Sequence, residues 1–181
     1  MSGPAVAATN EFSRIVTPDR LGGPKVTESI EASLAEREAV ARRLGILSVE
    51  RLAAQVTVKS VGNQLFRVLG AWQAEVRQAC VVTLEPVAES LEGDFEVDYQ
   101  AGDAAASHEA DVVIDPEAAD PAEILPEEGI DLGELVVQEM SVALDPYPRA
   151  PGAEVPEQYR PPEVEEDEGP FSALKALKGE K

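Results

Sequence analysis

Apolar and polar residues alternate along one long stretch of the chain, from Phe66 to Leu84. The alternating apolar set contains the protein's only tryptophan, Trp72, and its only cysteine, Cys80. A period of two is typical of an extended strand with one buried face. Because strands are typically about 5–6 residues long, we expect Gly70 to mark a bulge or bend that divides the run into two segments.

The same alternation predicts shorter strands on either side of this stretch. Residues 52–59 alternate in the same way, and Gly62-Asn63 can supply the positive φ angles of a tight hairpin turn. Pro86 ends the long run, because proline cannot donate to a central ladder. Residues 95–99 alternate again, and Glu11–Val16 contains the apolar residues of a short first strand.

A first helix is predicted from its capping residues. Ser33 and Glu36 match a capping box, in which each side chain hydrogen-bonds to the backbone amide of the other residue. The helix that follows, Leu34–Leu44, ends at Gly45, a residue favoured just beyond a helix C-terminus. Whether it begins as early as Thr27 stays open at this point.

A second helix begins at Asp131, where Glu134 repeats the capping pattern before a stripe of apolar residues at helical spacing. Pro146 stops this helix after Leu144. We therefore predict an α+β fold, a single domain over about residues 11–148, in which two main helices cover a mainly antiparallel sheet.

The long alternating run also predicts which side chains form the core of this domain. We expect the four residues Trp72, Val76, Cys80 and Leu84 to share its buried face.

The rest of the chain is predicted to lie outside the packed domain. Residues 1–10 are small and indicate a mobile N-terminus, and residues 100–129 indicate an acidic flexible loop. Within that loop only Val112–Ile114 is plausible as an edge strand. Residues 149–169 form an acidic, proline-rich linker that we expect to be extended and solvated.

The C-terminal residues 170–178 return to an amphipathic helical pattern. Pro170 suits the first position of a short helix, and three apolar residues follow at helical spacing beside two lysines. An isolated helix this short is marginal in water, so it either docks on its own domain or orders on a partner. We favour the second and name as candidate partner-binding residues Phe171, Leu174, Leu177, Lys175 and Lys178.

Charge is divided unevenly between the two halves of the chain. Residues 1–84 contain 10 Lys/Arg and 8 Asp/Glu, whereas residues 85–181 contain 5 and 27, and the net charge of the whole chain is −20. A strongly acidic segment repels bare phosphate backbones and attracts basic partners. DNA is therefore not an expected partner, although the acid could also serve solubility alone.

No motif for catalysis, a cofactor or a metal is present. The single His108 lies among acids without a second nitrogen or sulfur ligand nearby, and Cys80 is interpreted as an inert core thiol. A lone cysteine cannot form an internal disulfide and fits a reducing compartment. With no secretory signal and no apolar run of the roughly 20 residues that span a bilayer, we expect a cytoplasmic protein that binds no membrane and is not an enzyme.

Two motifs in the domain resemble the YceD family of bacterial large ribosomal RNA accumulation proteins, which has plastid relatives. Family members have a strand that ends in Cys-x-x-Cys-Leu, often followed by proline, and here Cys80, Leu84 and Pro86 occupy those places. Thr83 stands where many members have the second cysteine, which removes the case for a paired-thiol site. The family also has a late helix that opens with Ile-Asp-Leu, matched by Asp131 and Leu132.

A third motif extends the resemblance to the end of the chain. Family chains end in Pro-Phe-x-x-Leu-x-x-Leu-Lys, and the matching tail begins at Pro170 and Phe171. The resemblance implies a role in the accumulation or maturation of large-subunit ribosomal RNA, without implying a molecular mechanism.

Two classes of function remain open. The favoured one is a non-enzymatic assembly factor that binds a basic ribosomal protein or an assembly intermediate. The alternative is a direct RNA-binding module, which would require its basic side chains to converge on one surface with aromatic rings beside them. The candidate residues for this alternative are Arg37, Arg42, Arg43, Arg51, Lys59, Arg67 and Arg77.

Overall fold

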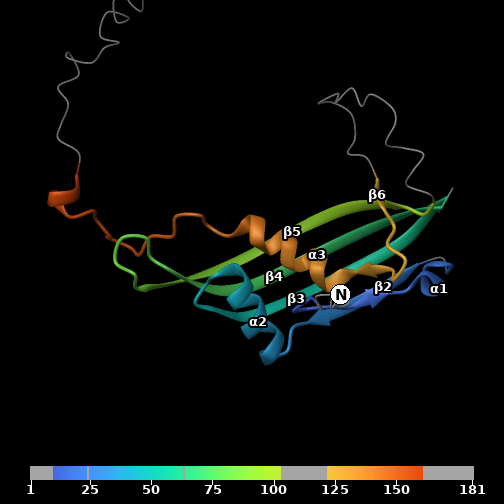
Figure 1. The fold of residues 1–181 in the computed structure, drawn as a ribbon, viewed down its shortest axis with the longest axis horizontal. Helices are drawn as coiled ribbons and strands as arrows, with labels where there is room; N and C mark the ends of the chain where they lie inside the picture. Colours follow the sequence, from blue (N-terminus) through green and yellow to red (C-terminus); the bar gives the residue numbers. More distant parts are fainter. Residues whose placement is uncertain (1–9, 24, 63, 103–121, 161–181) are drawn as a thin grey trace, which may run out of the picture. The chain divides into compact units, whose positions relative to one another are not determined.

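A five-stranded sheet with the strand order β2-β3-β4-β5-β6 forms the body of the protein (Figure 1). The computed structural model describes residues 10–23, 25–62, 64–102 and 122–160. Neighbouring strands are antiparallel except for β5 and β6, which are parallel. The strands are β2 (Val26–Glu31), β3 (Ser48–Gly62), β4 (Leu65–Ala79), β5 (Pro86–Gln100) and β6 (Glu123–Ile124).

The three central strands each run for 15 residues without a break. The expected division of the long run at Gly70 is therefore wrong, because Gly70 stays in register between Val56 on β3 and Phe95 on β5. A Cβ at Gly70 would lie far inside van der Waals distance of the Phe95 ring. The glycine is thus required for close approach of an aromatic ring and not for a bend.

A second aromatic residue covers a glycine between the same two strands, this time from β4 onto β5. Trp72 on β4 lies opposite Gly93 on β5, and a Cβ at Gly93 would lie 3.0 Å from Trp72 Nε1. Two aromatic residues therefore lie over glycines of the opposite strand, in inner-face pairs that are two positions apart. In this arrangement the ring covers backbone that glycine leaves bare. Both side chains are buried, as the sequence predicts for Trp72.

One face of the sheet, which we call the inner face, is apolar and is packed against the helices. It includes Val56, Val68 and Val76, each exposed by 1% or less. Helix α2 (Leu34–Leu44) packs on β3, and helix α3 (Leu132–Ala143) packs on β5 and β4. The α+β fold, with a mainly antiparallel sheet and two main helices, is confirmed.

A bulge in β3 extends the inner face by one more core residue. Val49 pairs with Val76 and Arg51 with Glu75, so Glu50 is an extra residue between two regular pairs. Because a bulge shifts the alternation by one, both Val49 and Leu52 are buried although they are three positions apart.

The prediction that Leu84 belongs to the core is wrong, because Leu84 lies in the turn after β4. Leu84 is 77% exposed, because the strand ends at Ala79 and the chain then turns back to begin β5 at Pro86. Leu84 has a φ of 62°, in the left-handed region. Trp72, Val76 and Cys80 are buried as predicted.

The N-terminal segment also differs from the sequence-based expectation. The strand predicted over Glu11–Val16 is only β1 (Ile15–Val16), which pairs with β7 (Ile130–Asp131) in a separate two-stranded sheet. Thr27 belongs to strand β2, so helix α2 does not extend back to it. A short helix, α1 (Pro18–Leu21), lies between β1 and β2.

The chain forms two compact units, with the boundary between Ala150 and Pro151. The described part of the second unit contains a single 3-10 turn, η2 (Glu157–Tyr159), and an ion pair between Arg160 and Glu154 at 2.7 Å. Within the described ranges no helix has both the length and the apolar character needed to cross a membrane.

Because the Phe95 ring lies against Gly70, we expect Gly70→Ala to lower the free energy of unfolding by roughly 1–3 kcal/mol, the usual cost of overpacking. The added methyl group would collide with the Phe95 ring. Gly22→Ala is the matched control, because its Cβ would lie 3.6 Å from the nearest atom and its φ is −65°. Urea unfolding measures both variants, and equal stabilities would contradict the proposed contact.

Candidate binding surface

The side chains that alternate with the core point away from the helices and form a polar surface, which we call the open face. Register between the strands places these residues in rows across the sheet. On β2 and β3 they are Thr27, Ser29, Glu31, Arg51, Ala53, Gln55, Thr57 and Lys59. On β4 and β5 they are Arg67, Leu69, Ala71, Gln73, Glu75, Arg77, Ala88, Ser90, Glu92, Asp94, Glu96 and Asp98.

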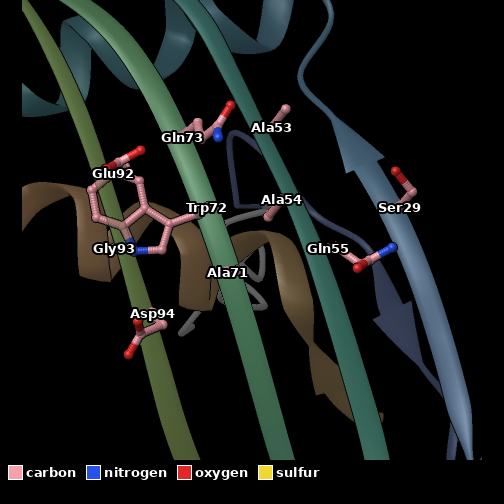
Figure 2. A pocket seen from close by; sticks show the side chains of 10 residues that line it. All are labelled: Ser29, Ala53, Ala54, Gln55, Ala71, Trp72, Gln73, Glu92, Gly93 and Asp94. Carbon is pink, nitrogen blue, oxygen red and sulfur yellow. The ribbon is translucent and has the colours of Figure 1, made fainter.

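The centre of the open face is hollow because small and long side chains alternate there. Ala53 lies opposite Gln73, and Gln55 lies opposite Ala71. The two alanines leave a depression of about 520 Å³, which Figure 2 shows from close by. The other open-face side chains that line it are Ser29 on β2 and Glu92 and Asp94 on β5.

The outer strand β5 carries four carboxylates on the open face, and two of them are ion-paired with one arginine of the protein. Arg67 binds Asp98 through two hydrogen bonds of 2.8 Å, and its Nη1 lies 2.6 Å from Glu96. The hydrogen bonds from Arg67 lower the pKa of Asp98 below its ordinary value. Within the described ranges no salt bridge or hydrogen bond reaches the side chains of Glu92 and Asp94, and both residues are exposed.

These two acids escape the sequence analysis because the first half of β5 does not alternate strongly enough to be recognised as a strand. Gly93 interrupts the inner-face pattern, and Glu89 occupies an inner-face position opposite Val76. The signal that could have found them is the acid at every second position from Glu92 to Asp98.

The outer edge of β5 is almost entirely without a partner strand among the described residues. β6 pairs only with Tyr99 and Gln100, and the Leu125 amide donates to the Gln100 carbonyl. From Val87 to Asp98 no described backbone group hydrogen-bonds to this edge. Because β5 is antiparallel to β4, every second residue in this stretch directs its backbone N–H and C=O outward, away from β4.

The seven candidate RNA-binding residues lie on two different parts of the structure. Arg37, Arg42 and Arg43 belong to α2, whereas the other four lie on the open face. Two more of the seven are ion-paired, in addition to Arg67. Arg43 binds Glu134 at 2.7 Å and Glu11 at 3.1 Å, and Arg77 binds Glu50 at 2.5 Å.

Aromatic rings are absent from the described open face. Phe66, Trp72, Phe95 and Tyr99 all occupy inner-face positions of β4 and β5. Single-stranded nucleic acids are usually bound by stacking bases on exposed rings within a basic groove. The open face, as far as the described ranges show it, provides neither feature.

Cys80, the first of the family-motif residues, sits in a tight turn that surrounds its sulfur with backbone amides. The amides of Val82, Thr83 and Ala150 donate to Sγ at 3.4, 3.4 and 3.3 Å. The Ala150 hydrogen bond and then those from Thr83 lower the pKa of this thiol to about 6. The thiol is buried, but its surroundings are polar, unlike the apolar core predicted for it.

This turn also joins the end of β4 to the segment that follows α3. The Val81 amide donates to the Pro148 carbonyl at 2.9 Å, and Gln78 Nε2 donates to the Asp145 carbonyl at 2.9 Å. Leu84 and Pro86 complete the motif by reversing the chain and starting β5. The motif is thus a structural junction.

The second motif, around Asp131, fixes the start of α3. Asp131 Oδ1 accepts hydrogen bonds from the amides of Gly133 and Glu134, and from the Arg14 amide at 2.8 Å. Leu132 beside it is completely buried. The Glu134 carboxylate binds Arg43 of α2, so this helix start is tied to both the N-terminal segment and α2.

The third motif and the partner-binding tail lie outside the described residues. Pro170, Phe171, Leu174, Lys175, Leu177 and Lys178 all belong to that part of the chain, as do Val112–Ile114 and His108. Among the described residues no group of three or more His, Cys, Asp or Glu side chains is arranged to hold a metal ion.

The fold and the open face define a small α+β module that exposes an acidic, hollow sheet surface. The family model described as "Large ribosomal RNA subunit accumulation protein YceD" matches residues 68–178, more than half of the chain, and the chain therefore belongs to this family. The match confirms the resemblance drawn from the motifs, and it connects the chain with the accumulation of large-subunit ribosomal RNA. No curated protein and no solved structure matches the chain.

The Cys80 turn predicts a stability that depends on pH. A thiol whose pKa is about 6 in the folded protein and about 9 when unfolded stabilises the fold fully above about pH 9, and this contribution is lost as the pH falls through about 6. Cys80→Ser keeps an acceptor but does not titrate there. We expect the stability difference between wild type and Cys80→Ser to grow from pH 6 to pH 9 in urea unfolding under reducing conditions. A difference that stays constant over this range would show that the thiol is not ionised.

Proposed function

We propose that the protein supports large-subunit ribosomal RNA accumulation without catalysing a reaction, by binding a basic ribosomal protein or assembly partner on the open face of its sheet. The observation that carries this proposal is the pair Glu92 and Asp94, two exposed carboxylates without a described ion pair beside a hollow. A surface with unpaired carboxylates is prepared for cationic side chains that come from another molecule.

The lining of the hollow suits the end of a lysine or arginine side chain. The carboxylates accept charge-assisted hydrogen bonds, and the amide oxygens of Gln55 and Gln73 can accept others. Ala53 and Ala71 provide the space that a long side chain needs. Arginine or lysine reaching this site would gain acceptors without displacing an internal partner.

The overall charge favours the same class of partner. With a net charge of −20, the chain attracts a basic protein at long range and repels the phosphate backbone of RNA. Ribosomal RNA could accumulate through such a factor if the factor keeps a basic ribosomal protein soluble and delivers it to the assembling subunit. The protein would then act on RNA through its partner.

A binding role also agrees with the chemistry of the exposed acids. Carboxylates that act as general acids or bases are usually placed where burial or a coupled neighbour tunes them. Glu92 and Asp94 are exposed and lie on the rim of an open depression. Direct RNA binding by the seven basic residues is the competing function, and the experiment below separates the two.

Affinity purification of the full chain from cells, with and without RNase, tests this function. We expect ribosomal proteins to remain bound after RNase treatment, because the contact is between proteins. The double variant Glu92→Gln with Asp94→Asn should lose most of this capture. Arg51→Gln with Lys59→Gln, on the same face, should retain it.

The competing function gives the opposite pattern. Loss of all ribosomal proteins after RNase, together with loss of bound RNA in the Arg51→Gln and Lys59→Gln variant, would replace protein binding with direct RNA binding. Thermal unfolding of each variant serves as the folding control, and exposed open-face substitutions are expected to change stability little.

A further inference from the structure

The unpaired outer edge of β5 is unusual for its length. β5 has 15 residues, and only Tyr99 and Gln100 pair with β6. Natural proteins usually shorten, cover or charge such an edge, because its free backbone groups can pair with another chain. The β5 edge is charged on its open face, but it is neither short nor, among the described residues, covered over most of its length.

The side chains along this edge differ between the two faces of the strand. On the open face, every second residue from Glu92 to Asp98 is an acid. On the inner face, Val87 and Leu91 are only partly buried, whereas their neighbours on β4 are buried. A strand placed beside β5 would meet carboxylates on the open face. On the inner face it would meet mainly apolar side chains, with Glu89 between Val87 and Leu91.

We propose that the basic partner adds an extended segment to the outer edge of β5, between Val87 and Asp98, as a further strand of the sheet. This inference rests on the proposed function and specifies how the partner binds. Backbone hydrogen bonds along the edge supply affinity, and side chains at alternate positions supply specificity. The partner segment therefore has lysine or arginine at every second position and apolar residues between them.

The charges on β5 indicate which of its residues meet these basic side chains first. Arg67 already forms ion pairs with Glu96 and Asp98, so the open-face acids of β5 without a described ion pair are Glu92 and Asp94. They are two residues apart, which matches the spacing of side chains on one face of a strand. Opposite charges on directly facing strand positions are favourable.

A second copy of this protein is a poor occupant for the same edge. Antiparallel pairing of two β5 strands across their acidic stretch would place Glu92 opposite Asp98, and Asp94 opposite Glu96, of the other copy. Like charges directly opposite each other on neighbouring strands are destabilising. The acids thus discourage self-association and favour a basic strand.

The test uses the full chain and three fluorescent peptides of identical composition in lysine and valine. The first alternates the two residues, the second groups all lysines before all valines, and the third alternates but carries N-methyl groups on one edge of its backbone. Fluorescence anisotropy measures binding of each peptide. We expect the alternating peptide to bind at least about tenfold more tightly than the other two, because only it can satisfy both the edge and the charge pattern.

Variants of the chain then locate the contact. Removing both charges with Glu92→Gln and Asp94→Asn should weaken binding of the alternating peptide by roughly fivefold to tenfold. Glu127→Gln with Glu128→Gln is the matched control, since it removes two exposed charges outside the sheet edge. Equal weakening by both double variants, or equal binding of all three peptides, would show general electrostatic attraction and would overturn strand addition.

Another segment of this same chain could also pair with the outer edge of β5, and hydrogen exchange tests this alternative. Amide hydrogen exchange of the free protein should show unprotected outer-edge amides between Val87 and Asp98 that become protected with the alternating peptide. Protection in the free protein that disappears in Val113→Pro would identify the sequence-predicted strand at 112–114 as the occupant and would overturn the proposal.

Failure of strand addition is distinguishable from failure of the proposed function. If ribosomal proteins resist RNase in the purification but the alternating peptide shows no preference, the partner binds in another manner and only the strand inference fails. If no basic protein is captured at all, the proposed function fails as well.

Discussion

Two aromatic residues that lie opposite glycines on the neighbouring strand set the geometry of the sheet. Phe95 approaches Gly70, and Trp72 approaches Gly93, so that each of these two aromatic residues lies over backbone without a side chain. These two aromatic side chains can thus lie in neighbouring pairs of the inner face without separating the strands. Because close packing tolerates little change in volume, these glycines cannot gain a methyl group cheaply, and both strands can continue for 15 residues.

The same arrangement determines what remains for the other face. The aromatic residues of β4 and β5 lie on the inner face, whereas the open face carries mostly short and polar side chains. Two of these, Ala53 and Ala71, leave the central hollow. β6 pairs only with the last two residues of β5, so the acids of β5 lie outside the part that β6 covers. The hollow and the acids of β5 lie on the face opposite the core, and a partner can use both without disturbing the core.

The sequence predicts the elements whose signals are local. The capping box of Ser33 and Glu36 gives α2 with its observed bounds, and Asp131 gives the start of α3. The burial of Trp72 follows from alternation alone. Gly70 is misread, because a glycine that admits a ring from another strand and a glycine that bends a strand are identical in sequence.

What the sequence could not supply depends on pairing between distant residues. The burial of Val49 beside Leu52 requires the bulge at Glu50, and the exposure of Leu84 requires the turn around Cys80. Glu92 and Asp94 remain without a described ion pair because Arg67 pairs with Glu96 and Asp98 instead. The bulge, the turn and these ion pairs depend on residues of neighbouring strands and segments, so the sequence of one strand does not predict them.

Site-specific photo-cross-linking in cells tests most directly whether the outer strand is the binding surface. Benzoylphenylalanine in place of Ser90 lies on the open face of β5 beside Glu92, and the same group in place of Arg42 lies exposed on α2. We expect position 90 to give covalent adducts with basic ribosomal proteins that survive RNase, and position 42 to give few. Adducts with RNA at position 90, or protein adducts from position 42 alone, would contradict the assignment of the binding surface to β5.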